Sequence, residues 1–291
     1  MPLLVTLHVY SQSPDPTWIL SEEQARDFVD RCRSLPERTP LKARAIASRL
    51  GYRGFSVQSV PRPHLGEVRF AIDNGIVDVA REEMSYFDRD RHMESWLFGT
   101  APGEAVEGLS EHVQEALSRS AEEVIDEQRQ ALVVQPHVTA CAPRAADAPV
   151  FDERKWTVGI SMSNNNCYNY IHDQVRNEFS RPGRSHGVAI SSACPVVEAA
   201  AEADGLVHAA GFDQELGPGE GWYVALAVWP GRDSHWYRQD ADGCWSHKLG
   251  QDEVSRKDNL KMPIVNPWSC DRRPYVNFCT FMIVRRDLRI A

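Results

Sequence analysis

The sequence predicts an α+β protein of two domains, and three observations support this. Its 291 residues are long for one hydrophobic core and short for three. Segments with helical periodicity and segments with strand periodicity occur in both halves of the chain. Residues 135–154 contain three prolines and little periodicity, as a linker does. We therefore expect an N-terminal α+β domain at 1–134 and a second domain at 155–291.

The N-terminal domain is expected to pack helices on a small, mostly antiparallel sheet. Ser21 is a typical N-cap residue, and Gln24 stands at the capping-box position three residues later. Asp73-Asn74-Gly75 is a typical turn between two strands. The expected elements are, in order, a strand at 3–10, helices at 22–32 and 41–50, strands at 52–60 and 67–77, and a helix at 105–134.

The C-terminal domain is expected to combine helices with an antiparallel meander. A run of three asparagines before Cys167 favours a helix start there, because asparagine is poor inside a helix and good at its N-cap. Apolar residues at helical spacing continue to Phe179, and Pro182-Gly183 ends the run. The other expected elements are a helix at 195–205, meander strands at 222–229, 234–239 and 244–248, and a final strand at 275–284.

The composition argues against several classes of protein. Acidic residues outnumber basic ones, 41 against 32, for a net charge of −9. Nucleic acid is therefore not an expected partner, because Lys and Arg hold the phosphate backbone. No apolar run approaches the roughly 20 residues that span a bilayer, and no basic segment typical of a secretory signal opens the chain. We expect a cytoplasmic protein with no membrane partner.

The cysteines and short motifs narrow the chemistry. Seven cysteines are an odd number, and no CxxC pair is present, so reduced thiols are expected rather than a disulfide framework or a structural zinc site. The chain lacks a GxGxxG or GxxxxGK[ST] loop and a GxSxG elbow. We therefore expect no cofactor and no serine nucleophile.

Cys167 is the candidate nucleophile. A sulfur at a helix N-terminus is more readily ionised to the thiolate, because backbone N–H groups and the helix dipole stabilise negative charge. The backbone N–H groups of 166–168 and the Asn166 amide would bind a developing oxyanion. The alternative is a capped helix with a half-buried structural cysteine. Cys194 also precedes a helix, but its small apolar neighbours favour a packed cysteine.

His235 is the candidate general base, on the second strand of the meander. A four-residue turn would place Gln239 opposite Cys244 and put His235 and His247 on opposite faces of the sheet. The two imidazoles then could not share a metal ion, although a bulge or an odd-length loop would reverse this conclusion. Asp258 is chosen to orient the base. Other candidates for that role are Asn259, Asn266 and Asp271.

The order of these elements, a helix-start cysteine followed by a meander with histidine, resembles the papain-like superfamily over residues 155–291. Bacterial NlpC-type and CHAP-type amidases belong to that superfamily, and the resemblance implies a papain-like arrangement with helices packed on the meander. Separately, the strings NNCYNY (165–170), HWYRQDADGCWSHKLG (235–250) and YVNFCTFM (275–282) look like a little-characterised group of bacterial, fungal and invertebrate proteins. This second resemblance implies a recurring module without a known reaction.

Three functions follow from these observations. The first is a cysteine-dependent amide or acyl hydrolase or acyltransferase acting on a peptide or small-molecule amide, with Cys167, His235 and Asp258 as catalytic residues. Its substrate-binding residues would be Asn166, Tyr168, Trp236, Tyr237, Trp245 and His247. The second is a non-enzymatic, tryptophan-rich recognition module for a protein or glycan, because six of the eight tryptophans follow residue 155. The third is a metal-dependent enzyme using His235 and His247.

Overall fold

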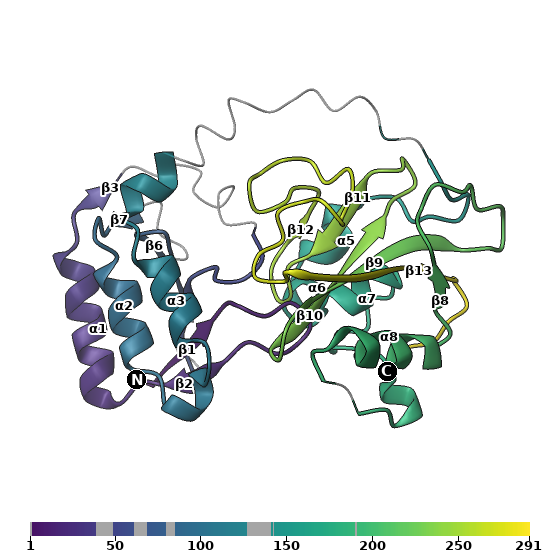
Figure 1. Ribbon diagram of the computed structural model, residues 1–291. Coiled ribbons are helices and arrows are strands. Elements are labelled where there is room, and N and C mark those ends of the chain that lie inside the picture. The colour runs from purple at the N-terminus through teal and green to yellow at the C-terminus, as the bar shows by residue number, and fades with distance from the viewer. Residues whose placement is uncertain are drawn as a thin grey trace. The chain divides into compact units, whose positions relative to one another are not determined.

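The structure is a computed structural model, and it confirms the α+β class. It describes residues 2–38, 49–60, 69–79, 85–126, 141, 143–189 and 191–291. These residues form helices and two antiparallel sheets (Figure 1). The chain divides into two compact units. The first consists of Met1–Val9, Asp15–Ala47 and Tyr52–Val133, and the second of Tyr10–Pro14, Ser48–Gly51 and Val134–Ala291.

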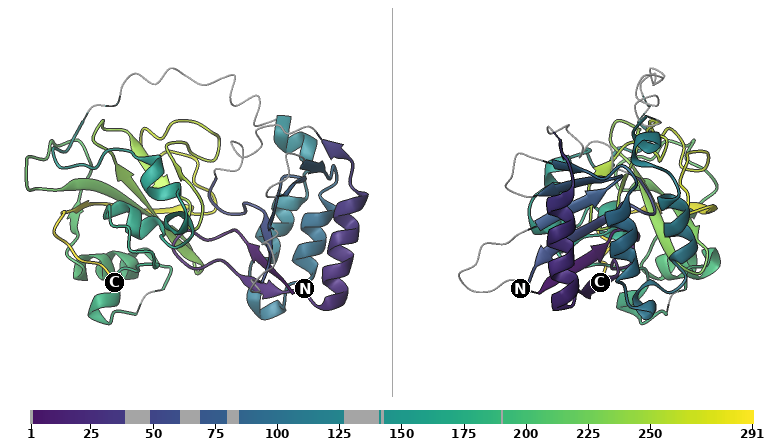
Figure 2. Two further views of the ribbon diagram at one scale, coloured as in Figure 1. Left: turned by 180° about the vertical axis from the view of Figure 1, so that it is seen from behind. Right: turned by 90° about the vertical axis from the view of Figure 1, so that its left-hand side faces the viewer.

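The first unit contains a seven-stranded antiparallel sheet in the order β2-β1-β4-β5-β6-β7-β3. Helices α1, α2 and α3 lie beside one another along this sheet (Figure 2). The strands are β1 (Leu3–Leu7), β2 (Thr17–Ile19), β3 (Glu37–Arg38), β4 (Phe55–Ser59), β5 (Arg69–Asp73), β6 (Ile76–Val79) and β7 (Ser85–Phe87). The helices are α1 (Glu22–Ser34), α2 (His92–Gly99), the 3-10 turn η2 (Gly103–Val106) and α3 (Ser110–Leu117).

Two local predictions in this unit are confirmed. Ser21 and Gln24 form the predicted capping box at the start of α1. Asn74 and Gly75 take positive φ angles in the turn between β5 and β6, as their residue types favour. The predicted helix at 41–50 lies almost entirely outside the described residues. The described part of the predicted helix at 105–134 is instead broken into η2, α3 and a further helical stretch at 121–126.

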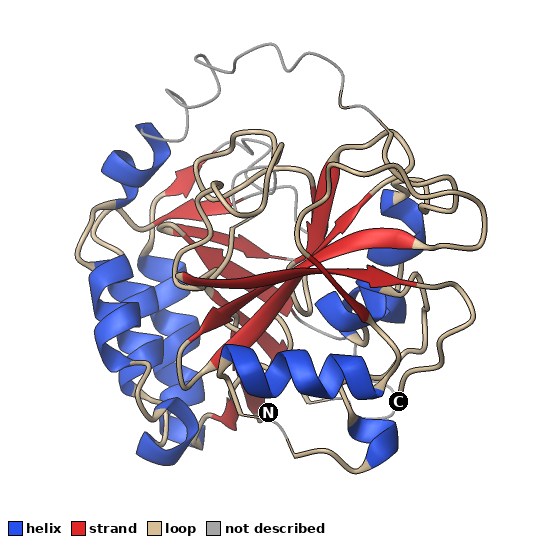
Figure 3. Cartoon of the chain, turned by 45° about the vertical axis from the view of Figure 1, so that its right-hand side comes forward, coloured by secondary structure: helices blue, strands red, loops and turns tan. Residues whose placement is uncertain are grey.

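The second unit is built on a six-stranded antiparallel sheet in the order β12-β11-β10-β9-β13-β8. Figure 3 draws the strands of the protein in red and its helices in blue. The predicted meander is confirmed as the centre of this sheet. The strands are β8 (Val207–Ala209), β9 (Trp222–Trp229), β10 (Asp233–Gln239), β11 (Trp245–Lys248), β12 (Val254–Ser255) and β13 (Asn277–Val284). The helices are α5 (Glu153–Thr157), α6 (Ile160–Ser163), α7 (Cys167–Ile171), the 3-10 turn η3 (Arg184–His186) and α8 (Cys194–Ala203).

Both faces of this sheet are covered. Helices α7 and α8 pack on one face, where Leu226 and Trp236 belong to a buried apolar cluster. On the other face, Ala225 and Tyr237 belong to a second cluster, which the loop at 256–276 helps to cover through Ile264. Strands β9 and β10 are therefore buried on both sides, and alternate residues enter alternate cores.

The register of β10 and β11 differs by one residue from the predicted one. Gln239 lies opposite Trp245, so the connecting loop is 240–244 and has five residues. This odd length changes which residues share a face. It brings His235 and His247 to the same face of the sheet, where the four-residue turn had separated them.

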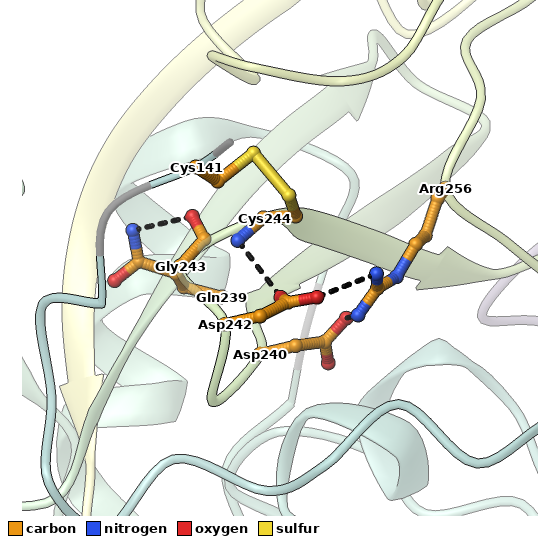
Figure 4. The surroundings of a disulfide bond; sticks show 7 residues. All are labelled: Cys141, Gln239, Asp240, Asp242, Gly243, Cys244 and Arg256. Atoms are coloured by element: carbon orange, nitrogen blue, oxygen red, sulfur yellow. Dashed lines mark hydrogen bonds and ion pairs between the residues drawn. A yellow bond between two sulfur atoms is a disulfide. The ribbon is translucent and has the colours of Figure 1, made fainter. Parts of the chain in front are cut away.

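Two disulfides correct the expectation of reduced thiols. Cys141 is bonded to Cys244, which lies in the β10–β11 loop rather than in a strand, 103 residues further along (Figure 4). Cys194 at the start of α8 is bonded to Cys279 in β13, 85 residues further along. The prediction of reduced cysteines is therefore wrong for these four residues. Cys32, Cys167 and Cys270 are free thiols.

The predicted linker at 135–154 is described only at 141 and 143–154. These residues are packed into the second unit. Besides the disulfide at Cys141, Ala145 and Ala148 are buried in the apolar cluster beneath α7 and α8. The Ala146 N–H donates to the carbonyl oxygen of Leu216 over 3.0 Å.

Candidate functional site

Cys167 begins helix α7 where the sequence predicts, but its surroundings do not suit a nucleophile. Asn166 is the N-cap residue, and its side-chain oxygen accepts the N–H groups of Tyr168 and Asn169. The Cys167 side chain is 0 % exposed and belongs to the apolar cluster under α7. Burial raises the pKa of this thiol well above its ordinary value, and the negative charge of Asp233 raises it further. The thiol is therefore protonated at neutral pH.

His235 lies on the opposite face of the sheet from Cys167. Its ring contacts those of Tyr237 and Tyr275, which belong to the cluster on that other face. Trp236, the next residue, points to the face where Cys167 is buried. The structure therefore does not bring Cys167 and His235 together, because adjacent strand residues point to opposite faces.

His235 instead pairs with His247. His235 Nε2 lies 2.8 Å from His247 Nδ1, and His247 Nε2 lies 3.1 Å from the carbonyl oxygen of Lys257. Because a carbonyl oxygen only accepts, His247 Nε2 carries a proton, and a neutral His247 then accepts the His235 Nε2–H at Nδ1. Across the described residues, no three His, Cys, Asp or Glu side chains gather as a metal would require. The two histidines of the metal-enzyme hypothesis are therefore adjacent, but the described part of the chain supplies no third ligand beside them.

Asp258 organises the loop at 256–276 and does not orient an imidazole. Its Oδ1 accepts the backbone N–H groups of Leu260 and Met262 over 3.0 and 2.9 Å, and Oδ2 accepts that of Asp271 over 3.1 Å. Burial raises the pKa of this carboxyl, and the three donors oppose that rise. Asp258 therefore has a structural role in its loop and not the predicted role of orienting the base.

The asparagines before Cys167 also serve the fold. The Asn166 amide accepts two N–H groups at the start of α7 and donates to the carbonyl oxygens of Gln12 and Ser180 over 2.9 and 2.8 Å. Its hydrogen-bonding capacity is therefore used. Asn165 accepts the N–H groups of Arg176 and Asn177 over 2.8 and 3.0 Å. These side-chain bonds hold a loop where the sequence predicts more helix, so α7 ends at Ile171 and not near Phe179.

The aromatic residues predicted to shape a pocket lie in the core. Tyr168 donates its hydroxyl to Asp204 over 2.8 Å, and Trp236 donates its indole N–H to Gln12 over 3.1 Å. Tyr237 and Trp245 are buried in the second apolar cluster. The tryptophan-rich meander therefore forms core rather than surface. Among the tryptophans after residue 155, Trp268 in the loop at 256–276 is the exception, with 62 % of its surface exposed.

A shallow depression of about 200 Å³ opens on the second unit near the end of α6. Phe179 is the aromatic residue of its lining, and the other lining residues apart from Pro14 have polar side chains. Asn164, Asn177 and Glu178 are exposed at its edge, and Gln251 is half-buried. The complete lining is Pro14, Ser163, Asn164, Asn177, Glu178, Phe179 and Gln251.

Several polar groups of this depression are not used by the fold. Asn164 and Asn177 accept hydrogen bonds through Oδ1, from Ser163 Oγ and Asn165 Nδ2, and their Nδ2 groups donate to no described residue. Glu178 binds Arg176 through Oε1 alone. The Gln251 amide bonds to no described side chain or backbone group. No sequence motif marks these residues, because they come from four separate stretches of chain.

The described helices offer no candidate for a membrane span. No family model matches the chain, and no solved structure matches it. One curated protein does match: insoluble matrix shell protein 1 of Ruditapes philippinarum is 36% identical over 141 residues.

That match covers 48% of this chain and 93% of the relative. About half of the chain therefore has no counterpart in the relative. A relative named for an insoluble shell matrix contradicts the predicted cytoplasmic localisation. The two disulfides agree with this correction, because disulfides persist in oxidising compartments outside the cytosol. By this match, the chain belongs to the same family as insoluble matrix shell protein 1.

Proposed function

We propose that the second unit is a non-catalytic recognition module of an extracellular matrix, and that it binds one saccharide unit of a glycan at the depression near α6. The observation that carries this proposal is the set of unused polar groups at a depression that Phe179 also lines. Asn164, Asn177 and Gln251 offer amides, and Glu178 offers a carboxylate oxygen.

The chemistry of the depression suits a sugar. A saccharide carries hydroxyls that both donate and accept, which amides and carboxylates complement. Its apolar C–H face packs against an aromatic ring such as Phe179. The depression, about 200 Å³, is smaller than the roughly 300–1,000 Å³ of sites for drug-sized ligands. This size favours a single ring of a longer chain.

Catalysis by a Cys–His pair is the less supported function. A papain-like arrangement requires a thiolate beside an imidazole in a cleft. Here Cys167 is fully buried, its pKa is raised, and His235 belongs to the other face of the sheet. The name of the relative refers to an insoluble shell matrix, which agrees better with a recognition function than with catalytic turnover of a substrate.

Saccharide binding by the full chain tests this proposal. We expect titration calorimetry with neutral hexose and N-acetylhexosamine oligosaccharides to detect binding. Asn177→Ala and Gln251→Ala should each weaken it about three- to tenfold, because each loses a hydrogen bond worth roughly 0.5–1.5 kcal/mol.

The matched control is Gln214→Ala, which removes an exposed amide that does not line the depression and should leave the Kd unchanged. Absence of binding to every oligosaccharide would contradict the proposal. So would binding that both depression variants retain and Trp268→Ala abolishes, because the exposed loop would then be the site.

A further inference from the structure

A short segment near the N-terminus packs into the second unit, although its neighbours in the sequence belong to the first unit. Residues Tyr10–Pro14 belong to that unit, whereas the residues on both sides, including β1 and β2, belong to the first unit. Ser11 and Gln12 are buried. The second unit therefore contains a five-residue segment whose sequence neighbours on both sides belong to the first unit.

Asp233 recognises the backbone of this segment. Its carboxylate accepts the successive N–H groups of Ser11, Gln12 and Ser13 over 2.7, 3.1 and 3.1 Å, and the Ser13 hydroxyl over 2.9 Å. The Tyr275 hydroxyl donates to the same carboxylate over 2.7 Å. A buried carboxylate needs such donors, because desolvation of its charge is otherwise costly.

The start of helix α7 holds the carbonyl groups of the same segment. The Cys167 N–H donates to the Ser11 carbonyl oxygen over 3.4 Å, and the Asn166 side-chain amide donates to that of Gln12 over 2.9 Å. These are donors that the sequence predicts for an oxyanion. In the structure they bind peptide carbonyls.

Side-chain recognition centres on Gln12. Its Oε1 accepts hydrogen bonds from the Ser234 hydroxyl and from the Trp236 indole N–H. Both donors lie on β10, one and three residues after Asp233. A residue without this side-chain acceptor would leave the buried Ser234 hydroxyl and Trp236 indole N–H unsatisfied, which is unfavourable.

Gly250 allows the segment to approach closely. This glycine has φ +63°, and a Cβ there would lie 2.3 Å from the Tyr10 carbonyl oxygen and 3.1 Å from the Ser11 Cα. Glycine is the residue that tolerates both this φ angle and a close backbone neighbour. Together, Asn166, Asp233, Ser234, Trp236 and Gly250, with the Cys167 N–H, form what we call the segment cradle.

We propose that the segment cradle is a peptide-recognition site for the Ser-Gln-Ser segment of this chain, and that a second copy of the chain can supply that segment in place of the first. The contacts named here join residues 10–13 to the second unit, so the same segment on another copy would make the same bonds. An exchange of identical contacts between copies is the basis of domain swapping. This inference does not depend on saccharide binding.

A complementation experiment with two full-length variants tests the exchange. Gln12→Pro removes the Gln12 N–H and the side-chain acceptor and leaves the cradle intact. Asp233→Asn leaves the segment intact and replaces one of the two accepting carboxylate oxygens with an amide NH₂, which cannot accept the N–H groups bound there. We expect each variant alone to be monomeric by light scattering, and an equimolar mixture to form a 1:1 heterodimer.

A second measurement covers the case in which Asp233→Asn does not fold. A fluorescent peptide of residues 8–16, HVYSQSPDP, should bind the folded Gln12→Pro chain and not the wild type, whose cradle is occupied. The same peptide with alanine in place of glutamine should bind at least tenfold more weakly. Gln12→Ala serves as the open-cradle chain if Gln12→Pro does not give a native circular dichroism spectrum.

Three results would overturn the proposal. The first is a mixture of two folded variants that remains monomeric. The second is a folded open-cradle chain that does not bind the peptide. The third is a wild-type chain that binds the peptide as tightly as the open-cradle chain, because the peptide would then occupy some other site.

Discussion

Loss of the disulfides is expected to destabilise the second unit by about 2–4 kcal/mol for each bond. Cys141–Cys244 spans 103 residues and Cys194–Cys279 spans 85, and cross-links over long loops restrict the unfolded chain most. The two loops overlap in sequence, so the effects are not expected to add fully. Urea denaturation with and without reductant measures the change in the free energy of unfolding.

The control for this experiment is Cys270→Ser, which removes a free thiol and leaves both disulfides. It should keep the full reductant sensitivity of the wild type, whereas the paired variants Cys141→Ser/Cys244→Ser and Cys194→Ser/Cys279→Ser should each lose part of it. Equal denaturation midpoints for oxidised and reduced wild type would contradict the prediction.

Acidification is expected to weaken the fold through His172. This histidine follows α7 and is 3 % exposed, and its ring packs against Tyr168 at 4.7 Å between centroids. Burial lowers its pKa from 6.5 to about 3, while the nearby charge of Asp204 acts in the opposite direction. Neither ring nitrogen bonds to a described residue. The folded protein therefore keeps this imidazole neutral.

The sign of the pH dependence follows from these values. Below pH 6.5 the unfolded chain binds a proton at His172 and the folded chain does not, so stability is complete above pH 6.5 and falls toward pH 3. The slope is about 1.4 kcal/mol per pH unit over most of that window. Equilibrium urea denaturation between pH 7 and pH 4 measures it.

His172→Phe keeps an aromatic ring and removes the titrating group, so it should flatten the profile by that slope. The exposed His208 is the control, and His208→Gln should retain the wild-type profile. A His172→Phe profile parallel to that of the wild type would assign the acid sensitivity to other groups.

The sequence predicts much of the fold where one residue type decides a local structure. Ser21 with Gln24, the Asn74-Gly75 turn and the asparagines before Cys167 each mark an element boundary that the structure confirms. The pairing register of two strands, in contrast, is not decided by any single residue type. One extra residue in the loop at 240–244 moves His247 to the face of His235, and alternation along a strand cannot reveal it.

The candidate site is harder to predict because burial and tertiary partners decide what a polar residue does. A cysteine at a helix start is a nucleophile only where solvent or a base reaches it, and the core around Cys167 excludes solvent. The role of Asp258 is likewise decided by its partners in the folded chain, which are backbone N–H groups of its own loop. The depression near α6 has no periodic signature, because Pro14 and Gln251 meet there only in the folded chain.

Alkylation of each cysteine in the native, unreduced protein at pH 7, followed by mass spectrometry, tests the central claim most directly. A disulfide-stabilised, non-catalytic module predicts no alkylation of Cys141, Cys194, Cys244 and Cys279 without reductant, and a Cys167 thiol that reacts no faster than the partly exposed Cys270. Rapid, selective alkylation of Cys167 in the folded chain would contradict this claim and would support a cysteine-hydrolase function for the second unit.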